Sequence, residues 1–207
     1  MTDWRAWHLG YDDPSSPLSV RLTAVQDQIR AWLEVAPARQ LRVLSACSGL
    51  GLDLRGVLDG HPRRDDVAGR LVELDPELAA RSRQLLAEAG VRAVEVVERD
   101  AGDTTSYASW VPADLLLLCG VFGNVSDADI QNTAANAARL CSPGATVIWT
   151  RHRRAPDLTP AIRQWWVEAG FEEITFVSHG TDAPSVGACR LVAEPLPFKE
   201  MRLFTFD

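Results

Sequence analysis

Short apolar runs and amphipathic segments alternate along most of the chain. Apolar runs of strand length occur at 41–46, 67–74, 91–98, 113–120 and 145–150. Between them lie segments with helical spacing or helix-end residues, at 52–58, 76–89, 127–140 and 158–169. The run at 113–120 has almost no polar face, which is typical of a strand covered on both sides. The alternation therefore predicts an α/β fold, a doubly wound sheet with helices on both faces.

The N-terminal region departs from this alternation. P-S-S-P interrupts the chain at 14–17, and the segment after it carries apolar residues at helical spacing, with Ser19 as the predicted cap. We therefore assign residues 1–40 to an N-terminal helical arm and residues 41–207 to the main domain.

The C-terminal region departs from it as well. Strands are predicted at 171–178 and 187–193 with no helix between them, which indicates an antiparallel hairpin that completes the sheet. Residues 201–206 are predicted to extend the last strand or to form an edge strand.

The segment S-A-C-S-G-L-G-L-D at 45–53 lies at a strand-to-helix turn and allows three interpretations. A nucleophile elbow would need glycines on both sides of Ser48, and a phosphate loop would need a Lys after its last glycine; neither is present. A reactive Cys47 would need positive charge close by, and the neighbouring sequence offers none. The third interpretation is a loop in which Gly49 and Gly51 let a ligand approach the backbone. An acid at the end of the next strand, Glu73, supports it, since such an acid can bind ribose hydroxyls.

Four segments together resemble the class I S-adenosylmethionine-dependent methyltransferases. They are L-R-V-L-S-A-C-S-G-L-G, R-L-V-E-L-D-P-E-L, V-V-E-R-D-A-G-D and A-D-L-L-L-L-C-G-V-F-G-N-V. The resemblance covers the chain from about Leu41 onward. It implies a seven-stranded, mostly parallel Rossmann-like sheet with an antiparallel last strand, and a helical lid ahead of it. It also implies S-adenosylmethionine as cofactor and methyl transfer, leaving S-adenosylhomocysteine.

The resemblance also implies which residues bind the cofactor. In this family the acid at Glu73 holds the ribose, the Asp at position 100 meets the adenine amino group, and the loop after the fourth strand approaches the sulfonium. The implied set is Ser45, Cys47, Gly49, Gly51, Glu73, Leu74, Asp100, Ala101, Cys119, Gly120 and Val121. Two positions depart from the family: Ser45 replaces an acid and Cys47 a glycine, so how the methionine end is held is an open question.

Candidates for chemistry lie after the later strands and ahead of the first. His152, just past a buried strand, is the candidate general base, and Arg151 beside it could clamp a substrate anion. Asn124 could contact the substrate or cap a turn. The aromatic N-terminal segment is interpreted either as a lid over the substrate or as a packed arm, with candidate substrate contacts at Trp7, His8 and Tyr11.

The composition argues against some classes of binding partner. The net charge of −7 argues against nucleic acid, and no apolar run is long enough to span a membrane. The four cysteines form no C-x-x-C pair and no metal site is predicted, so we expect a cytoplasmic protein with reduced thiols. We expect a small-molecule acceptor. Trp165 and Trp166 are adjacent in one helix, where core packing is the favoured use and a homodimer contact the alternative.

Other functions remain open from sequence alone. An aminopropyl transferase, or another user of a bound sulfonium, would share the same cofactor region. The replacements at Ser45 and Cys47 also allow a non-catalytic binding protein. A nicotinamide-dependent reductase is a weaker alternative, because its fingerprint needs a glycine where this chain has Leu54.

Overall fold

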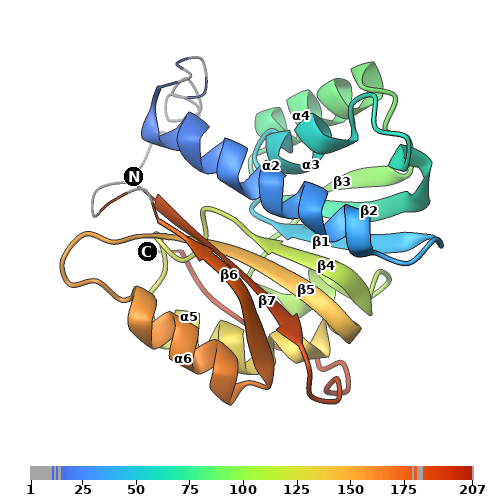
Figure 1. Ribbon diagram of the computed structural model, residues 1–207. Helices are drawn as coiled ribbons and strands as arrows, with labels where there is room; N and C mark the ends of the chain where they lie inside the picture. Colours follow the sequence, from blue (N-terminus) through green and yellow to red (C-terminus); the bar gives the residue numbers. More distant parts are fainter. Residues whose placement is uncertain (1–10, 12, 14, 179, 181–183, 207) are drawn as a thin grey trace.

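The fold is that of one twisted sheet between two layers of helices (Figure 1). The computed structural model describes residues 11, 13, 15–178, 180 and 184–206. Its strands are β1 (Leu41–Ala46), β2 (Val67–Glu73), β3 (Val94–Glu98), β4 (Ala113–Leu118), β5 (Cys141–His152), β6 (Phe171–Val177) and β7 (Pro184–Leu191). Its α-helices are α2 (Pro17–Val35), α3 (Leu52–Leu58), α4 (Pro76–Glu88), α5 (Asp127–Asn136) and α6 (Thr159–Glu168). Short 3-10 helices are η2 (Arg64–Asp66), η3 (Thr104–Tyr107) and η4 (Ala137–Arg139).

The seven strands lie in the order β3-β2-β1-β4-β5-β7-β6. Strands β1 to β5 are parallel to one another, and β7 runs antiparallel between β5 and β6. The predicted doubly wound sheet and its antiparallel last strand are confirmed. The chain passes outward from β1 to β3 and then returns to β4 on the other side of β1. The carboxyl ends of β1 and β4 therefore border the crevice where open α/β sheets bind ligands.

Each face of the sheet has its own hydrophobic core. Helices α2, α3 and α4 cover one face, and α5 and α6 cover the other (Figure 1). The first core includes Ile29 and Leu33 of α2 packed against strand residues such as Val43 and Leu117. Within the predicted N-terminal arm, α2 is thus part of the packed fold, while the segment before Tyr11 lies outside the described residues.

Helix α2 begins earlier than the sequence analysis predicts. Ser16, not Ser19, is the N-cap, and its side chain accepts a hydrogen bond from the Ser19 backbone N–H. Pro17 occupies the first helical turn, where its missing N–H costs nothing, so this proline starts the helix instead of only breaking the chain.

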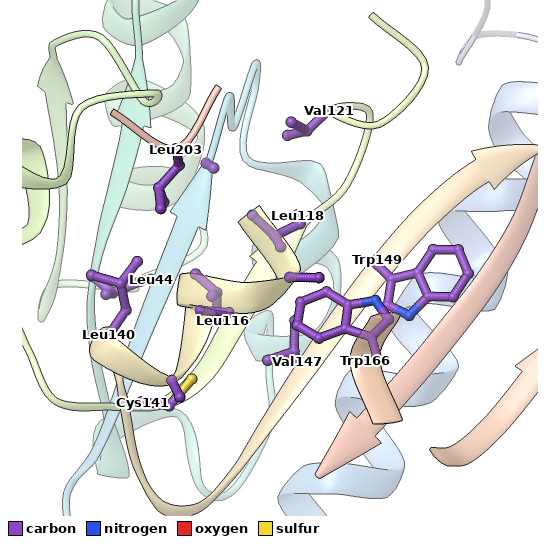
Figure 2. Packing of buried hydrophobic residues seen from close by; sticks show 14 of the residues in the cluster. Leu44, Leu116, Leu118, Val121, Leu140, Cys141, Val147, Trp149, Trp166 and Leu203 are labelled. Atoms are coloured by element: carbon purple, nitrogen blue, oxygen red, sulfur yellow. The ribbon is translucent and has the colours of Figure 1, made fainter. Parts of the chain in front are cut away.

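The second core contains several aromatic residues. Figure 2 shows two of them, Trp149 and Trp166, among aliphatic side chains of the same core. The Phe122 ring packs near two tryptophans, with centroid distances of 6.1 Å to Trp149 and 6.4 Å to Trp166. Trp166 is 2% exposed, so core packing is its use. Trp149 lies opposite Gly187 in the β5–β7 pair, and a Cβ on Gly187 would come within 2.3 Å of the indole ring. The glycine therefore makes room for the indole on the neighbouring strand.

The segment after β7 is neither a strand extension nor an edge strand, so that prediction is wrong. Residues 192–206 cross the α5 side of the sheet and return to the loops after β3 and β4. The Leu203 N–H donates to the Gly102 carbonyl at 2.7 Å, and Asn132 of α5 donates to the Leu203 carbonyl at 2.8 Å. Leu203 and Phe204 are buried in the second core. Loops and helix α5 hold this segment in place. The alternation of strands and helices along the sequence does not predict such contacts.

Candidate functional site

The loop between β1 and α3 is a tight turn at the carboxyl edge of the sheet. Cys47, Gly49 and Gly51 have φ of 51°, 53° and 67°, the left-handed region. The Ser48 N–H donates to the Val72 carbonyl, which ties the loop to β2. A Cβ on Gly51 would lie 2.8 Å from both a Leu71 methyl and the Ser82 hydroxyl, so the position requires glycine for space as well as for φ. Approach of a ligand to the backbone at Gly49 and Gly51 stays a prediction.

Glu73 at the end of β2 is fixed against this loop. Its Oε2 accepts a hydrogen bond of 2.7 Å from the Gly49 N–H, and its Oε1 accepts one of 2.9 Å from the Asp75 N–H. A carboxylate can accept about four hydrogen bonds, so these contacts orient Glu73 without using its full capacity. Leu74, next in the chain, is 69% exposed. An oriented carboxylate and an exposed apolar side chain can bind a hydroxylated ring system and cover its flat face.

Asp100 lies after the adjacent strand β3. Its Oδ1 accepts a hydrogen bond from the Gly102 N–H at 2.8 Å, and its Oδ2 pairs with the Arg202 guanidinium at 2.9 Å. Ala101 beside it is buried. Sequence reasoning missed Arg202, because residues 201–206 were predicted to extend the last strand or to form an edge strand, and not to return to this loop.

Cys119, Gly120 and Val121 follow β4 directly. The Gly120 N–H donates to the Thr150 hydroxyl at 2.9 Å, and the Asn124 amide donates to the Gly120 carbonyl at 2.7 Å. The Arg151 guanidinium donates to the Phe122 carbonyl. Asn124 and Arg151 thus hold the loop of residues 120–124 through its backbone. Substrate contact by either side chain stays a prediction.

His152 ends β5 beside the same loop. Its ring carbon Cδ2 lies 4.0 Å from where a Cβ on Gly123 would be, and its Nδ1 has no hydrogen-bond partner among the described residues. Burial, together with the positive charges of Arg151 and Arg154, lowers the pKa of His152 below 6.5. The imidazole is therefore neutral at pH 7 and can accept a proton.

The thiols near the loop are poor nucleophiles. Burial and the carboxylates of Glu73 and Asp100 raise the pKa of Cys47. Burial also raises the pKa of Cys119 well above 9.0. Both thiols stay protonated at neutral pH, which argues against a cysteine nucleophile.

The described residues include no group of three or more His, Cys, Asp or Glu side chains that could hold a metal ion.

A charged group that sequence reasoning missed lies beside the β4 loop. Arg21 of α2 donates a hydrogen bond to the Tyr11 hydroxyl. Asp53 lies in the first turn of α3, and its negative charge adds to the effect of burial in raising the pKa of Cys119. Arg21 is only 6% exposed and continues the buried helical stripe formed by Val25 and Ile29. A charged residue at a core-facing helical position is the sequence signal that could have found it. Of the other predicted N-terminal contacts, Trp7 and His8 lie outside the described residues.

Ser45 lies away from this group, within β1, where its Cα pairs with Leu71 and Leu117 on the two neighbouring strands. Its side chain is buried in the sheet. Cofactor contact by Ser45 stays a prediction.

Among the described residues, no helix combines the length and the apolar character needed to cross a membrane.

Comparisons with known proteins place the fold. No protein-family model and no curated protein matches the sequence. Among solved structures, magnesium protoporphyrin IX methyltransferase from Synechocystis, with bound S-adenosylmethionine, matches with a TM-score of 0.69 at 12% identity, covering 91% of each chain. An O-methyltransferase family protein from Burkholderia thailandensis matches with a TM-score of 0.62 at 18% identity. That match covers 84% of this chain and 57% of the other.

The pyocyanin biosynthetic protein PhzM matches with a TM-score of 0.58 at 16% identity, covering 84% of this chain and 55% of its own. This chain thus spans little more than half the length of two of these three proteins. The chain has the class I S-adenosylmethionine-dependent methyltransferase fold.

Proposed function

We propose that this protein is an S-adenosylmethionine-dependent methyltransferase that acts on a small-molecule acceptor. The observation that carries the proposal is the pair of strand-end acids, Glu73 and Asp100, on adjacent strands beside a glycine loop with left-handed backbone. Glu73 is oriented by two backbone N–H groups and can accept ribose hydroxyls. Asp100 can accept the adenine amino group, and Leu74 and Ala101 can cover the ring faces.

The cofactor supplies a methyl group already activated on a sulfonium, so the protein mainly positions the two reactants and excludes water. The backbone of Cys119, Gly120 and Val121 borders the crevice, and Thr150 and Asn124 fix the position of Gly120. His152, held neutral at pH 7, is the group available to accept a proton from an acceptor oxygen or nitrogen. The proposed acceptor side is therefore the space between the β4 loop and the end of β5.

The proposal of a small acceptor rests on the acidic balance of the chain. With a net charge of −7, the surface is a poor partner for nucleic acid.

Calorimetry with S-adenosylmethionine and S-adenosylhomocysteine tests the cofactor assignment. Binding of both at micromolar concentration is expected, and no binding at millimolar ligand would defeat the proposal. Product mass from turnover with candidate acceptors then separates the activities. Addition of one methyl group supports the proposal, whereas addition of an aminopropyl group would assign the protein to that other class of transferase. Cofactor binding without turnover across acceptor classes would favour a non-catalytic binding protein.

A further inference from the structure

The C-terminal segment is bonded along its length to the loop after β3 and to the start of η3. The Thr104 N–H donates to the Met201 carbonyl at 3.0 Å, and the Leu203 N–H donates to the Gly102 carbonyl at 2.7 Å. The Met201 N–H donates in turn to the Thr104 hydroxyl at 2.8 Å. A Cβ on Gly102 would collide with the Phe204 carbonyl oxygen, so the two backbones are in direct contact. The position of the β3 loop therefore depends on residues at the far end of the chain.

Arg202 links this segment to the Asp100 carboxylate. The Arg202 Nη1 donates to the Asp100 Oδ2 at 2.9 Å and to the Phe204 carbonyl at 3.3 Å. The Asp100 Oδ1 accepts a hydrogen bond of 2.8 Å from the Gly102 N–H. Each carboxylate oxygen is thus held by one donor, one from the loop and one from the C-terminal segment. Since a carboxylate can accept about four hydrogen bonds, Asp100 keeps the capacity to accept one from a ligand amino group.

The exposure of this ion pair indicates what it contributes. Both side chains are 49% exposed, and an ion pair with this much solvent contact contributes little to the stability of a fold. An aspartate as exposed as Asp100 would sample several rotamers if no cation held it, and ordering it on binding would cost part of the affinity. The contact with Arg202 therefore matters more for the orientation of the carboxylate than for stability.

We propose that Arg202 is a positioning residue for base recognition, which holds the Asp100 carboxylate in the orientation that accepts the amino group of adenine. This inference rests on the proposed function. Arg202 acts through Asp100 and needs no contact with the ligand. The C-terminal segment thereby contributes to the selectivity for adenine, although Arg202 lies 102 residues from Asp100 in the sequence.

The test compares two ligands that differ at one group. One is S-adenosylhomocysteine, and the other is its analogue with hydrogen in place of the amino group of adenine. By calorimetry, the wild type should bind S-adenosylhomocysteine about 10- to 100-fold more tightly than the analogue, the range of a hydrogen bond to a charged group. Arg202→Met should weaken S-adenosylhomocysteine binding about 3- to 10-fold, which corresponds to the cost of ordering one side chain. It should change the affinity for the analogue by less than about twofold, because the analogue makes no contact that depends on the Asp100 orientation.

A double variant separates positioning from a general effect on the loop. Asp100→Ala should remove the preference for S-adenosylhomocysteine. Adding Arg202→Met to Asp100→Ala should cause no further loss of affinity, because Arg202 acts only through the carboxylate that is already gone. Arg202→Lys keeps the positive charge and should show a smaller loss than Arg202→Met, and it takes the place of that variant if Arg202→Met does not fold.

Arg190→Met is the matched control. Arg190 lies on β7, near the opposite edge of the sheet from β3, and its guanidinium is 54% exposed and pairs with Glu172 at 2.9 Å. Its loss should leave both affinities unchanged.

Three results would overturn the role of Arg202. They are an unchanged affinity of Arg202→Met for S-adenosylhomocysteine, an equal loss for both ligands in that variant, and losses that add in the double variant. A wild type that binds both ligands equally well would overturn it too, since the amino group would then not be recognised, while cofactor binding itself would stand. A wild type that binds neither ligand is a separate outcome, because it defeats the proposed function on which this inference rests.

Discussion

Glu73 illustrates how backbone contacts prepare one side chain for a ligand. Its two oxygens accept hydrogen bonds from Gly49 and Asp75, so the rotamer is fixed before any ligand arrives. A side chain that is already ordered loses little conformational entropy when the ligand binds. More of the free energy of its contacts therefore contributes to affinity. His152 is made ready to accept a proton by its lowered pKa, which keeps the ring neutral. The role of Glu73 is therefore tested by ligand affinity, and that of His152 by the reaction rate and its pH dependence.

Replacing Glu73 with Ala should lower the affinity for S-adenosylhomocysteine by about 10- to 100-fold, because hydrogen bonds to a charged group contribute about 1.5–3 kcal/mol. Calorimetry provides the measurement. Glu88→Ala, at the exposed end of α4, is the matched control and should leave the affinity unchanged. An unaltered affinity in the Glu73 variant would place the ribose elsewhere.

Replacing His152 with Gln should lower kcat/KM by about 10²- to 10⁴-fold if it is the general base. S-adenosylhomocysteine affinity should be unchanged. A base works when deprotonated, and the lowered pKa keeps His152 neutral above pH 6.5. The wild-type rate should therefore be level near neutral pH and fall at acidic pH, with its midpoint below 6.5. A fall with the same midpoint in the variant would assign the titration to another group.

At the scale of elements, the segment after β7 is as much a part of the fold as a strand. It contributes Leu203 and Phe204 to the second core and brings Arg202 to Asp100. That ion pair is about half exposed, so it contributes at most about 1 kcal/mol to stability. The stability contributed by this segment comes from its buried apolar side chains.

Leu203→Ala should therefore reduce the free energy of unfolding by about 2–4 kcal/mol, the usual cost of truncating a buried leucine. Urea denaturation followed by circular dichroism measures it. Leu196→Ala, in the same segment but 40% exposed, should cost less than about 1 kcal/mol. Similar losses in the two variants would contradict the packing described for this segment.

At the scale of the whole molecule, the proposed site uses parts that are distant in sequence. Helix α2, the loops after β1, β3 and β4, and the C-terminal segment all meet at one edge of the sheet. A ligand bound there would contact segments that are distant in sequence and would favour the folded state as a whole. Its affinity should therefore appear in the thermal stability of the entire chain.

S-adenosylhomocysteine at about one hundred times its Kd should stabilise the protein by about 2.7 kcal/mol. For a chain of this size, that raises Tm by roughly 5–10 °C, which scanning fluorimetry can detect. The Glu73→Ala variant should show a much smaller rise at the same ligand concentration. An equal rise in both proteins would mean that the ligand binds away from the β2 end.

The fold was largely predictable because periodicity and turn residues are local signals. Glu73 and Asp100 each lie at or just after the end of an apolar run, so the sequence predicts both at strand ends. In the structure Glu73 ends β2 and Asp100 follows the neighbouring strand β3. The position of Arg21 beside the β4 loop was missed because it depends on how α2 packs on the rest of the fold. Arg202 was missed because nothing local distinguishes a segment that packs under α5 from an edge strand.

The close contact between Gly187 and Trp149 also constrains how this sequence can diverge. Any side chain at position 187 must displace the indole, since even a Cβ would come within 2.3 Å of it. Thr150, the next residue on β5, holds the Gly120 N–H, so a shift of β5 would be transmitted to the β4 loop. We therefore expect positions 149 and 187 to covary among related sequences, with larger residues at 187 accompanied by smaller ones at 149. Selection on the proposed site would thus act on two positions that contact no ligand.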